Sequence, residues 1–239
     1  MIKLERLTRK YGNFSAVDNL NLHVKRGEVF GFIGPNGAGK TTTIKMLGGI
    51  IPPTSGSIRI CGIDLLKNPE DAKRKTGFIP DRPYLYEKLT GMEFLRFIAD
   101  LYNVSNDVFL IKAEELLALF SLSDWSSELI ESYSHGMKQR LIMASALLHD
   151  PELFIVDEPL VGLDPAGIKM VRELFRNLAK ENKTIFMSTH TLKVAEDVCD
   201  RIGIINKGRL VAAGTFEELR QMAKTDRKGL EEVFFKLTN

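Results

Sequence analysis

Residues 34–41 read Gly34-Pro35-Asn36-Gly37-Ala38-Gly39-Lys40-Thr41, the complete G-x-x-x-x-G-K-[ST] pattern of a phosphate-binding loop. The apolar run 29–33 precedes the loop as a buried strand, and residues 41–47 follow it with apolar side chains at helical spacing. Glycines let backbone N–H groups turn inward, and the helix start adds positive potential. Lys40 would reach the β- and γ-phosphates, and Thr41, followed by Thr42, would offer a hydroxyl to Mg²⁺. The stretch predicts a nucleoside triphosphate site; the alternative is a glycine-rich turn with an unrelated lysine.

The composition favours a protein that works in a reducing compartment without nucleic acid. The 239 residues include 33 basic and 31 acidic side chains, interspersed along the chain, for a net charge of +2. This balance gives no bulk attraction to nucleic acid. Cys61 and Cys199 lie far apart and lack C-x-x-C spacing, so we expect two packed thiols. We expect a cytosolic protein, because no signal peptide and no apolar run of about 18 residues is present.

The order of strand and helix patterns predicts an α/β fold. Residues 1–30 are expected to form strands joined by turns, with alternation over 17–24, and the strand 57–62 is expected to join this N-terminal β lobe. From residue 134 onward, helices alternate with short apolar strands, which argues for parallel pairing. Residues 202–213 are expected to form a hairpin. At 239 residues, one large domain and a core with a smaller lobe both remain open.

Helix-start signals divide the rest of the chain. Thr90 with Glu93 forms a capping box for a helix that runs to about residue 101, and a second helix is expected over about 108–120. We therefore expect a helical insertion from about residue 82 to about residue 133. Ser134 can cap a helix that reaches residue 148. The apolar residues of the C-terminal stretch lie on one helical face: Leu230, Val233, Phe234 and Leu237. This face is expected to dock onto the core of the chain or to contact a partner.

Two acids end the apolar run 153–156. Asp157 and Glu158 would lie at the carboxyl end of a buried parallel strand, where ligands of such sheets bind. Asp157 would hold the Mg²⁺ shell and Glu158 would polarise the attacking water. The pair alone is a weak signal, since a polar turn after a strand is similar, but it becomes strong beside the phosphate loop. His190 ends another apolar strand, so we expect it at the same sheet edge, whereas His23 and His149 are expected to be structural.

Ser134 and Gly136 open a helix whose free N–H groups form a second anion site, about 94 residues beyond Lys40. A triphosphate held by its own loop does not need this second site. We therefore expect Ser134 and Gly136 to bind the phosphate held by another copy of the chain.

Taken together, these motifs resemble those of the nucleotide-binding subunit of ABC transporters, in the same order and spacing over residues 1 to about 220. The loop 34–41 resembles the family's Walker A, Asp157-Glu158 its Walker B, residues 161–164 its D-loop and His190 its switch histidine. Tyr11 stands where the family places an aromatic ring that stacks on adenine; a tyrosine in the protein core is the alternative.

The resemblance implies a P-loop (RecA-like), mainly parallel sheet core with an N-terminal antiparallel β lobe. The ATPase domain would span residues 1–220, with a helical lobe of about residues 82–133 inserted, and 221–239 would form a C-terminal helical extension. The implied cofactors are ATP and Mg²⁺. The implied catalytic residues are Glu158 and His190, and the implied metal ligands are Thr41, Asp157 and, with less support from the motif, Asp81.

Two stretches depart from the family pattern. The signature, usually L-S-G-G-Q, reads Tyr133-Ser134-His135-Gly136-Met137, so Met137 stands in place of the usual glutamine. Asp81 stands where the family usually has the glutamine of its Q-loop, and an acid there would bind Mg²⁺ as a charge. Both variants resemble those of bacterial exporters whose permeases are separate chains.

The resemblance also implies partners. We expect a second nucleotide-binding subunit, identical or different, a separate transmembrane permease, and a place on the inner face of the membrane through that permease. One alternative is a soluble ABC ATPase in translation or DNA repair, although such proteins usually carry two nucleotide domains or a long coiled coil. A non-hydrolysing regulatory nucleotide binder is opposed by Glu158 and His190.

Overall fold

The computed structural model describes residues 1–82, 84–160, 162–225 and 229–238. Pro83, Val161 and the end of the predicted C-terminal extension lie outside the described residues. The strands are β1 Ile2–Tyr11, β2 Phe14–Val24, β3 Val29–Ile33, β4 Ser55–Ile60, β5 Ile63–Asp64, β6 Thr76–Ile79, β7 Leu153–Asp157, β8 Thr184–Thr189, β9 Arg201–Asn206 and β10 Arg209–Gly214. The helices are α1 Lys40–Leu47, α2 Pro69–Arg74, α3 Gly91–Leu101, α4 Asn106–Leu119, α5 His135–Leu147, α6 Pro165–Lys180, α7 Leu192–Val198, α8 Phe216–Met222 and α9 Leu230–Thr238.

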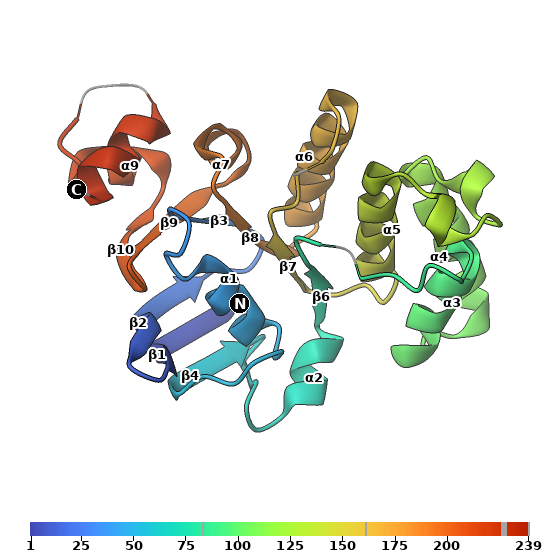
Figure 1. Cartoon of the computed structure of the whole chain (residues 1–239), viewed down its shortest axis with the longest axis horizontal. Helices are drawn as coiled ribbons and strands as arrows, with labels where there is room; N and C mark the ends of the chain where they lie inside the picture. Colours follow the sequence, from blue (N-terminus) through green and yellow to red (C-terminus); the bar gives the residue numbers. More distant parts are fainter. Residues whose placement is uncertain (83, 161, 226–228, 239) are drawn as a thin grey trace.

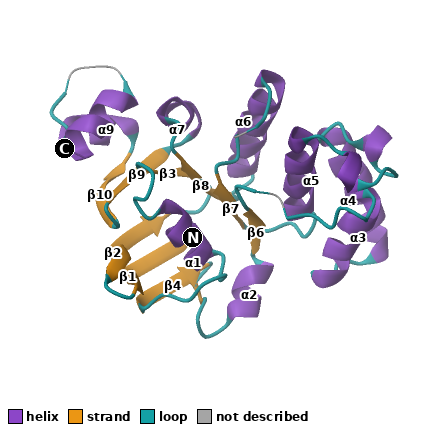
Figure 2. Cartoon of the chain, viewed as in Figure 1, coloured by secondary structure: helices purple, strands orange, loops and turns teal. Residues whose placement is uncertain are grey.

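The central sheet has the order β10-β9-β3-β8-β7-β6, and its pairs are parallel except for the β9–β10 hairpin (Figures 1 and 2). Side chains alternate between its faces along each strand. Phe30 and Phe32 of β3 pack with Phe186 of β8 on the face toward α1, whereas Val29 and Ile185 pack on the face toward α5 and α6. Burial on both faces explains why the strands read as continuous apolar runs. The predicted parallel core is confirmed.

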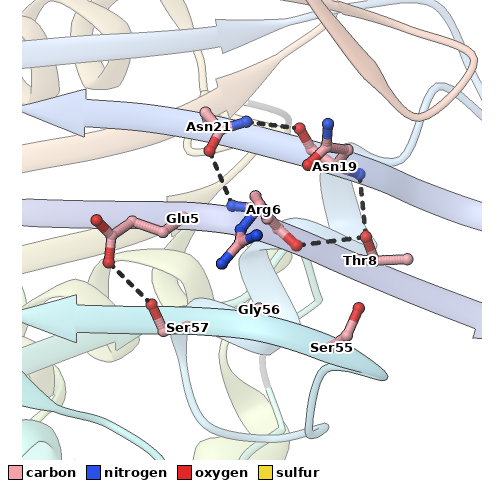
Figure 3. A pocket seen from close by; sticks show the side chains of 8 residues that line it. All are labelled: Glu5, Arg6, Thr8, Asn19, Asn21, Ser55, Gly56 and Ser57. Atoms are coloured by element: carbon pink, nitrogen blue, oxygen red, sulfur yellow. Dashed lines mark hydrogen bonds between the residues drawn. The ribbon is translucent and has the colours of Figure 1, made fainter.

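A second sheet, of order β2-β1-β4-β5, is antiparallel and forms the predicted N-terminal β lobe. A crease crosses its strands, where Arg6 of β1, Asn19 of β2 and Gly56 of β4 all have positive φ, of 49, 50 and 91°. The ladders shift register here. Asn21 Oδ1 accepts from Arg6 N at 2.8 Å, and Thr8 Oγ1 accepts from Asn19 N at 3.0 Å, so side chains replace the missing ladder bonds (Figure 3).

The crease reverses which residues face the core. In β1 the buried positions are Ile2 and Leu4 before it and Leu7 after it; in β2, Val17 precedes it and Leu20 follows. The alternation predicted over 17–24 is therefore interrupted at Asn19. Beyond the crease, the sheet reaches the central sheet, where Asp18 N donates to Gly208 O at 2.8 Å. Gly208 N in turn donates to Ala38 O at 2.9 Å, so β2 and the loop that follows β3 are both held by the β9–β10 turn.

The predicted helical insertion contains α3, α4 and the short 3-10 turns Ser123–Trp125 and Ile130–Ser132. Thr90 and Glu93 form the predicted capping box, and Ser134 Oγ accepts from Met137 N at the start of α5. Phe94, Leu95, Phe109 and Leu117 pack with Leu141 of α5 in one apolar cluster. The helices stand to one side of the central sheet, beyond β6 (Figure 1).

The C-terminal helix α9 docks on the chain itself. Leu230 and Val233 are fully buried against α7 and β9, and Phe234 and Leu237 pack at the margin of the same cluster. The prediction that this apolar face docks on the core is thus confirmed. Within the part of the chain that the structure describes, we find no helix long and apolar enough to cross a membrane.

Candidate nucleotide site

The loop that joins β3 to α1 is shaped by close backbone contacts. Gly39, at the N-terminus of α1, has φ of 106°, and a Cβ there would lie 2.4 Å from Ala16 O, so only glycine fits. Lys40 is 8% exposed, and its Nζ donates to the carbonyls of Gly34 at 2.7 Å and Pro35 at 3.2 Å. Burial lowers the pKa of Lys40, and the nearby carboxylates Glu158 and Asp157 oppose that change.

Asp157, the last residue of β7, is buried beside β8. The pairing register places it opposite Ser188, whose Oγ donates to Asp157 Oδ1. Burial raises the pKa of the Asp157 carboxyl, and the charges of Asp81 and Glu158 raise it further, while hydrogen bonds from Ser188 and Thr41 act in the opposite direction. The predicted metal ligands Thr41, Asp157 and Asp81 are thus close enough to influence one another.

Glu158 and His190 form a hydrogen-bonded pair. Glu158 follows β7 with a positive φ of 51°, and its backbone N donates to Ser188 O at 3.2 Å. This turn directs the Glu158 carboxylate toward β8, and Oε1 lies 2.8 Å from His190 Nδ1. The side chain of Glu158 is 14% exposed and that of His190 is 56% exposed. Both predicted catalytic residues therefore meet at one edge of the central sheet.

A cavity of about 500 Å³ joins the phosphate loop to this pair. Its lining contains most of the predicted site: Tyr11, Asn36, Gly37, Gly39, Lys40, Thr41, Thr42, Asp81, Glu158 and His190. Gly34, Pro35 and Ala38 complete the loop beside the cavity. Two further lining residues, Phe14 and Ala16, were not predicted. Phe14 pairs with Tyr11 across the β1–β2 turn, so the Gly12-Asn13 turn signal could have identified it.

Tyr11 lies at the rim of this cavity. Its side chain is 49% exposed, so the alternative of a core tyrosine is wrong. The guanidinium of Arg9 stands 4.7 Å from the centre of the Tyr11 ring, which holds the ring in place. Phe14 is 64% exposed next to it. The two rings offer a flat apolar surface to a base.

The donors near the loop suit a hard cation. Thr41 offers a hydroxyl, and Asp157 and Asp81 offer carboxylates, which are oxygen ligands that Mg²⁺ accepts. Among the described residues, no group of three or more His, Cys, Asp or Glu side chains could hold a metal ion unaided. A site with few protein ligands that phosphate oxygens complete is typical of Mg²⁺ with a nucleotide. The residues present therefore fit the predicted ion.

Ser134 and Gly136 do not line this cavity. They lie at the start of α5, where a Cβ on Gly136 would be 3.7 Å from Gly162 O. The three departures from the usual signature have different surroundings. Tyr133 is buried and its hydroxyl donates to Trp125 O at 2.5 Å, Met137 is buried in the helical lobe, and His135 remains exposed at the helix start.

The remaining histidines and the cysteines lie outside the site. His149 follows α5 and stacks on Tyr102 with ring centres 3.7 Å apart, while its Nε2 lies 3.2 Å from Thr76 O. Burial lowers the pKa of His149 to about 4, and its contacts agree with the expected structural role. Burial also raises the pKa of Cys61 and Cys199, which are free thiols.

Comparison with known proteins gives a consistent result. The profile of the family described as ABC transporter matches residues 17–161. The bacitracin transport ATP-binding protein BcrA of Bacillus licheniformis is 45% identical over 232 residues, which are 97% of this chain and 74% of that protein.

Two solved structures extend the likeness to the fold. An ATP-binding subunit of an ABC transporter is 36% identical, superimposes with a TM-score of 0.95, and covers 100% of both chains. A dimeric ATP-binding cassette in a post-hydrolysis state with ADP and Pi is 26% identical, with a TM-score of 0.78, over 90% of this chain and 98% of that one.

Proposed function

Because the chain belongs to the ABC transporter family and is an ATP-binding ATPase, we propose that two copies close around two Mg-ATP and drive a separate permease, in an exporter. The observation that carries this proposal is the cavity in which Glu158, paired with His190, faces Lys40 of the phosphate loop. A phosphate-binding lysine and a carboxylate at the place of an attacking water are what hydrolysis of a triphosphate needs.

In this proposal the residues 34–42 bind the phosphates, and Lys40 contacts the β- and γ-phosphates. When bound, Mg²⁺ neutralises charge on the phosphate oxygens, and Thr41, Asp157 and Asp81 would hold it. Glu158 Oε1 accepts a hydrogen bond from the attacking water. His190, whose Nδ1 contacts Glu158 Oε1 at 2.8 Å, orients that carboxylate and faces the γ-phosphate. The rings of Tyr11 and Phe14 support the base.

The dimer is supported by the position of Ser134 and Gly136. Both lie at the start of α5 and away from the cavity of their own chain, so they would complete the cavity of a partner. The related cassette with ADP and Pi is dimeric, which supports a dimer for this chain as well. We propose a homodimer; a heterodimer with a related subunit would use the same contacts.

The permease would bind the helical lobe, about residues 82–133, and hold the protein at the inner face of the membrane. We propose residues 1–220 as the ATPase domain and residues 221–239 as a helical extension. The likeness to a bacitracin transport protein supports a transport role, with the transported molecule chosen by the permease. A soluble role in translation or DNA repair has no specific observation in its favour.

The substitution Glu158→Gln tests the proposal. The variant should bind ATP and form a dimer with Mg-ATP, while its hydrolysis rate falls by about 100-fold or more, because the amide cannot accept the proton of the water. Light scattering with Mg-ATP measures the dimer, and phosphate release measures the rate.

The matched control is the double variant Lys40→Ala with Glu158→Gln, which should stay monomeric because nucleotide binding is lost. Hydrolysis by Glu158→Gln at the wild-type rate would move the catalytic role to another residue. A Glu158→Gln protein that binds Mg-ATP and remains a monomer would contradict the shared sites.

A further inference from the structure

The ring of His135 packs on the loop that follows Glu158. A Cβ on Gly162 would lie 2.5 Å from His135 Cδ2 and 2.8 Å from its Nε2, so the imidazole edge occupies the space beside the Gly162 Cα. Gly162 also has φ of 80°, a conformation that favours glycine. The contact thus joins the first residue of α5 to a loop whose neighbouring residues include the proposed catalytic carboxylate.

The start of α5 is held firmly on its other side. The hydroxyl of the buried Tyr133 donates to Trp125 O, and Gly91 leaves the space that this hydroxyl fills. Met137 is 8% exposed in the apolar cluster of the helical lobe, and its N–H donates to Ser134 Oγ. His135 therefore projects from a rigid base. A displacement of the start of α5 would therefore move the imidazole against Gly162, because the close packing on the other side leaves little room for local rearrangement.

The loop 162–164 is itself anchored at its far end. Asp164 caps α6, where its Oδ1 accepts from Gly167 N at 2.8 Å, and Leu163 packs against the apolar cluster that contains α6. At the near end, Glu158 has the positive φ of 51° that directs its side chain to His190. Gly162 therefore lies between Leu160, which packs against the same cluster, and Leu163.

We infer that His135 is a positioning residue that couples the two nucleotide sites of the dimer through its contact with Gly162. This inference rests on the proposed function, in which Ser134 contacts the nucleotide of the partner subunit. Closure of the start of α5 on that nucleotide presses the imidazole against Gly162, and the loop then holds Glu158 of the same chain in place for its own nucleotide. The contact makes hydrolysis in one site depend on occupancy of the other.

Two substitutions of His135 test whether the packing of its ring on Gly162 couples the two sites. His135→Gly removes the contact and should lower the Hill coefficient of ATP hydrolysis toward 1, with a loss of about 5-fold in the coupling between sites. His135→Phe keeps a flat ring and should retain the cooperativity. The affinity of the monomer for a fluorescent ATP analogue should be unchanged in both, because His135 lies outside the cavity.

A second variant tests the contact directly. In Gly162→Ala the added methyl group collides with the imidazole of His135, so this variant should have lower activity. Adding His135→Gly to Gly162→Ala should raise its activity, whereas His135→Gly alone should lower the activity of the wild type. The backbone strain at Gly162 is the same in both backgrounds, so the opposite signs isolate the steric contact.

Equal Hill coefficients for wild type and His135→Gly, or a loss of cooperativity in His135→Phe as large as in His135→Gly, would overturn the inference. A decrease of activity by His135→Gly in both backgrounds would also overturn it. Failure of the proposed function has a different result: wild-type hydrolysis without cooperativity, together with a monomeric Glu158→Gln variant. Circular dichroism of each variant at rising temperature shows that it is folded.

Discussion

Asp81 adds a carboxylate to a cavity wall that already carries Glu158, with Asp157 behind it. Its charge contributes to the raised pKa of Asp157, so the three acids repel one another and a triphosphate. Lys40 supplies one positive charge against them, and its own bonds go to loop carbonyls. A cation is therefore needed for the phosphates to bind closely.

We predict that Asp81→Asn strengthens ATP binding in the absence of Mg²⁺ and reduces the gain in affinity that Mg²⁺ produces. Removing the negative charge of Asp81 should change the binding free energy in each condition by about 1 kcal/mol, which is roughly a 5-fold change in the dissociation constant. Titration of a fluorescent ATP analogue with EDTA and with Mg²⁺ measures both quantities. Asp107→Asn, an exposed acid on α4, is the control and should change neither. Identical titrations for Asp81→Asn and wild type would place the Asp81 charge beyond the reach of the phosphates.

At the scale of single residues, the sequence predicted which residues form the site better than it predicted the contacts that each of them makes. Spacing alone located Lys40, Asp157 and Glu158, because a phosphate loop and an acid-ended strand are local patterns. The hydrogen bond between Glu158 and His190 depends on the pairing of β7 with β8 and on the positive φ of Glu158. The packing of His135 on Gly162 depends on tertiary structure, which no local pattern reports.

Among the elements, α5 links the helical lobe to the central sheet. Its start carries Ser134 and His135, its middle packs on the helical lobe, and its end leads to His149. His149 stacks on Tyr102 at the end of α3 and reaches Thr76 at the start of β6, so it joins the helical lobe to the central sheet. Among the described residues, its buried Nδ1 has no hydrogen-bond partner, so none of them accepts a second proton from the ring.

We predict that this joint weakens at mildly acid pH. The pKa of His149 is about 4 in the folded protein, below its ordinary value of 6.5, so the unfolded chain takes up the proton first. Stability from neutral His149 is fully present above pH 6.5 and is lost as the pH falls toward 4, with a slope of at most about 1.4 kcal/mol per pH unit. Urea unfolding between pH 5 and 7 measures it.

His149→Gln is the matched variant, since its amide keeps a donor for Thr76 O and does not titrate. Its stability should depend less on pH between 5 and 6.5 than that of the wild type, because the introduced amide does not titrate. An equally steep slope in His149→Gln would assign the pH dependence to other groups.

The boundaries of the elements followed from local signals where caps exist. Thr90 and Glu93 marked the start of α3, and Ser134 marked that of α5. The helix expected over 108–120 spans Asn106–Leu119 instead, and its N-cap residue Ser105 makes no side-chain cap bond. The crease in the antiparallel sheet was not predicted, since the spacing of Ile2, Leu4 and Leu7 also fits a strand followed by a turn.

At the scale of the whole molecule, the antiparallel sheet brings Tyr11 to the same cavity as the residues at the edge of the central sheet, while the start of α5 does not line that cavity. The fold class could be predicted because strands and helices alternate beyond residue 134 and both faces of the sheet are apolar. The second copy could be predicted only from the unused anion site at Ser134, since one chain carries no direct signal of its assembly.

We predict that hydrolysis per molecule rises with protein concentration, and that a mixture of Ser134→Arg and Glu158→Gln chains regains activity that neither has alone. In a mixed head-to-tail dimer, both lesions fall in one site and leave the other intact. The expected recovery is a fraction of wild-type activity, measured as phosphate release from the mixture. Mixed dimers, demonstrated with two affinity tags, that remain inactive would argue against sites shared between copies.

The crease across Arg6, Asn19 and Gly56 bears on how the chain folds. Plain alternating strands can pair in registers two residues apart with the same side chains buried. Here β1 and β2 each change the buried face once, and these changes must align with each other and with Gly56 of β4. A ladder displaced by two residues would bring the irregular backbone of one strand against the regular backbone of the next and leave the amides of Arg6 and Asn19 without acceptors. Mispaired hairpins are thereby disfavoured before the β lobe meets the rest of the protein.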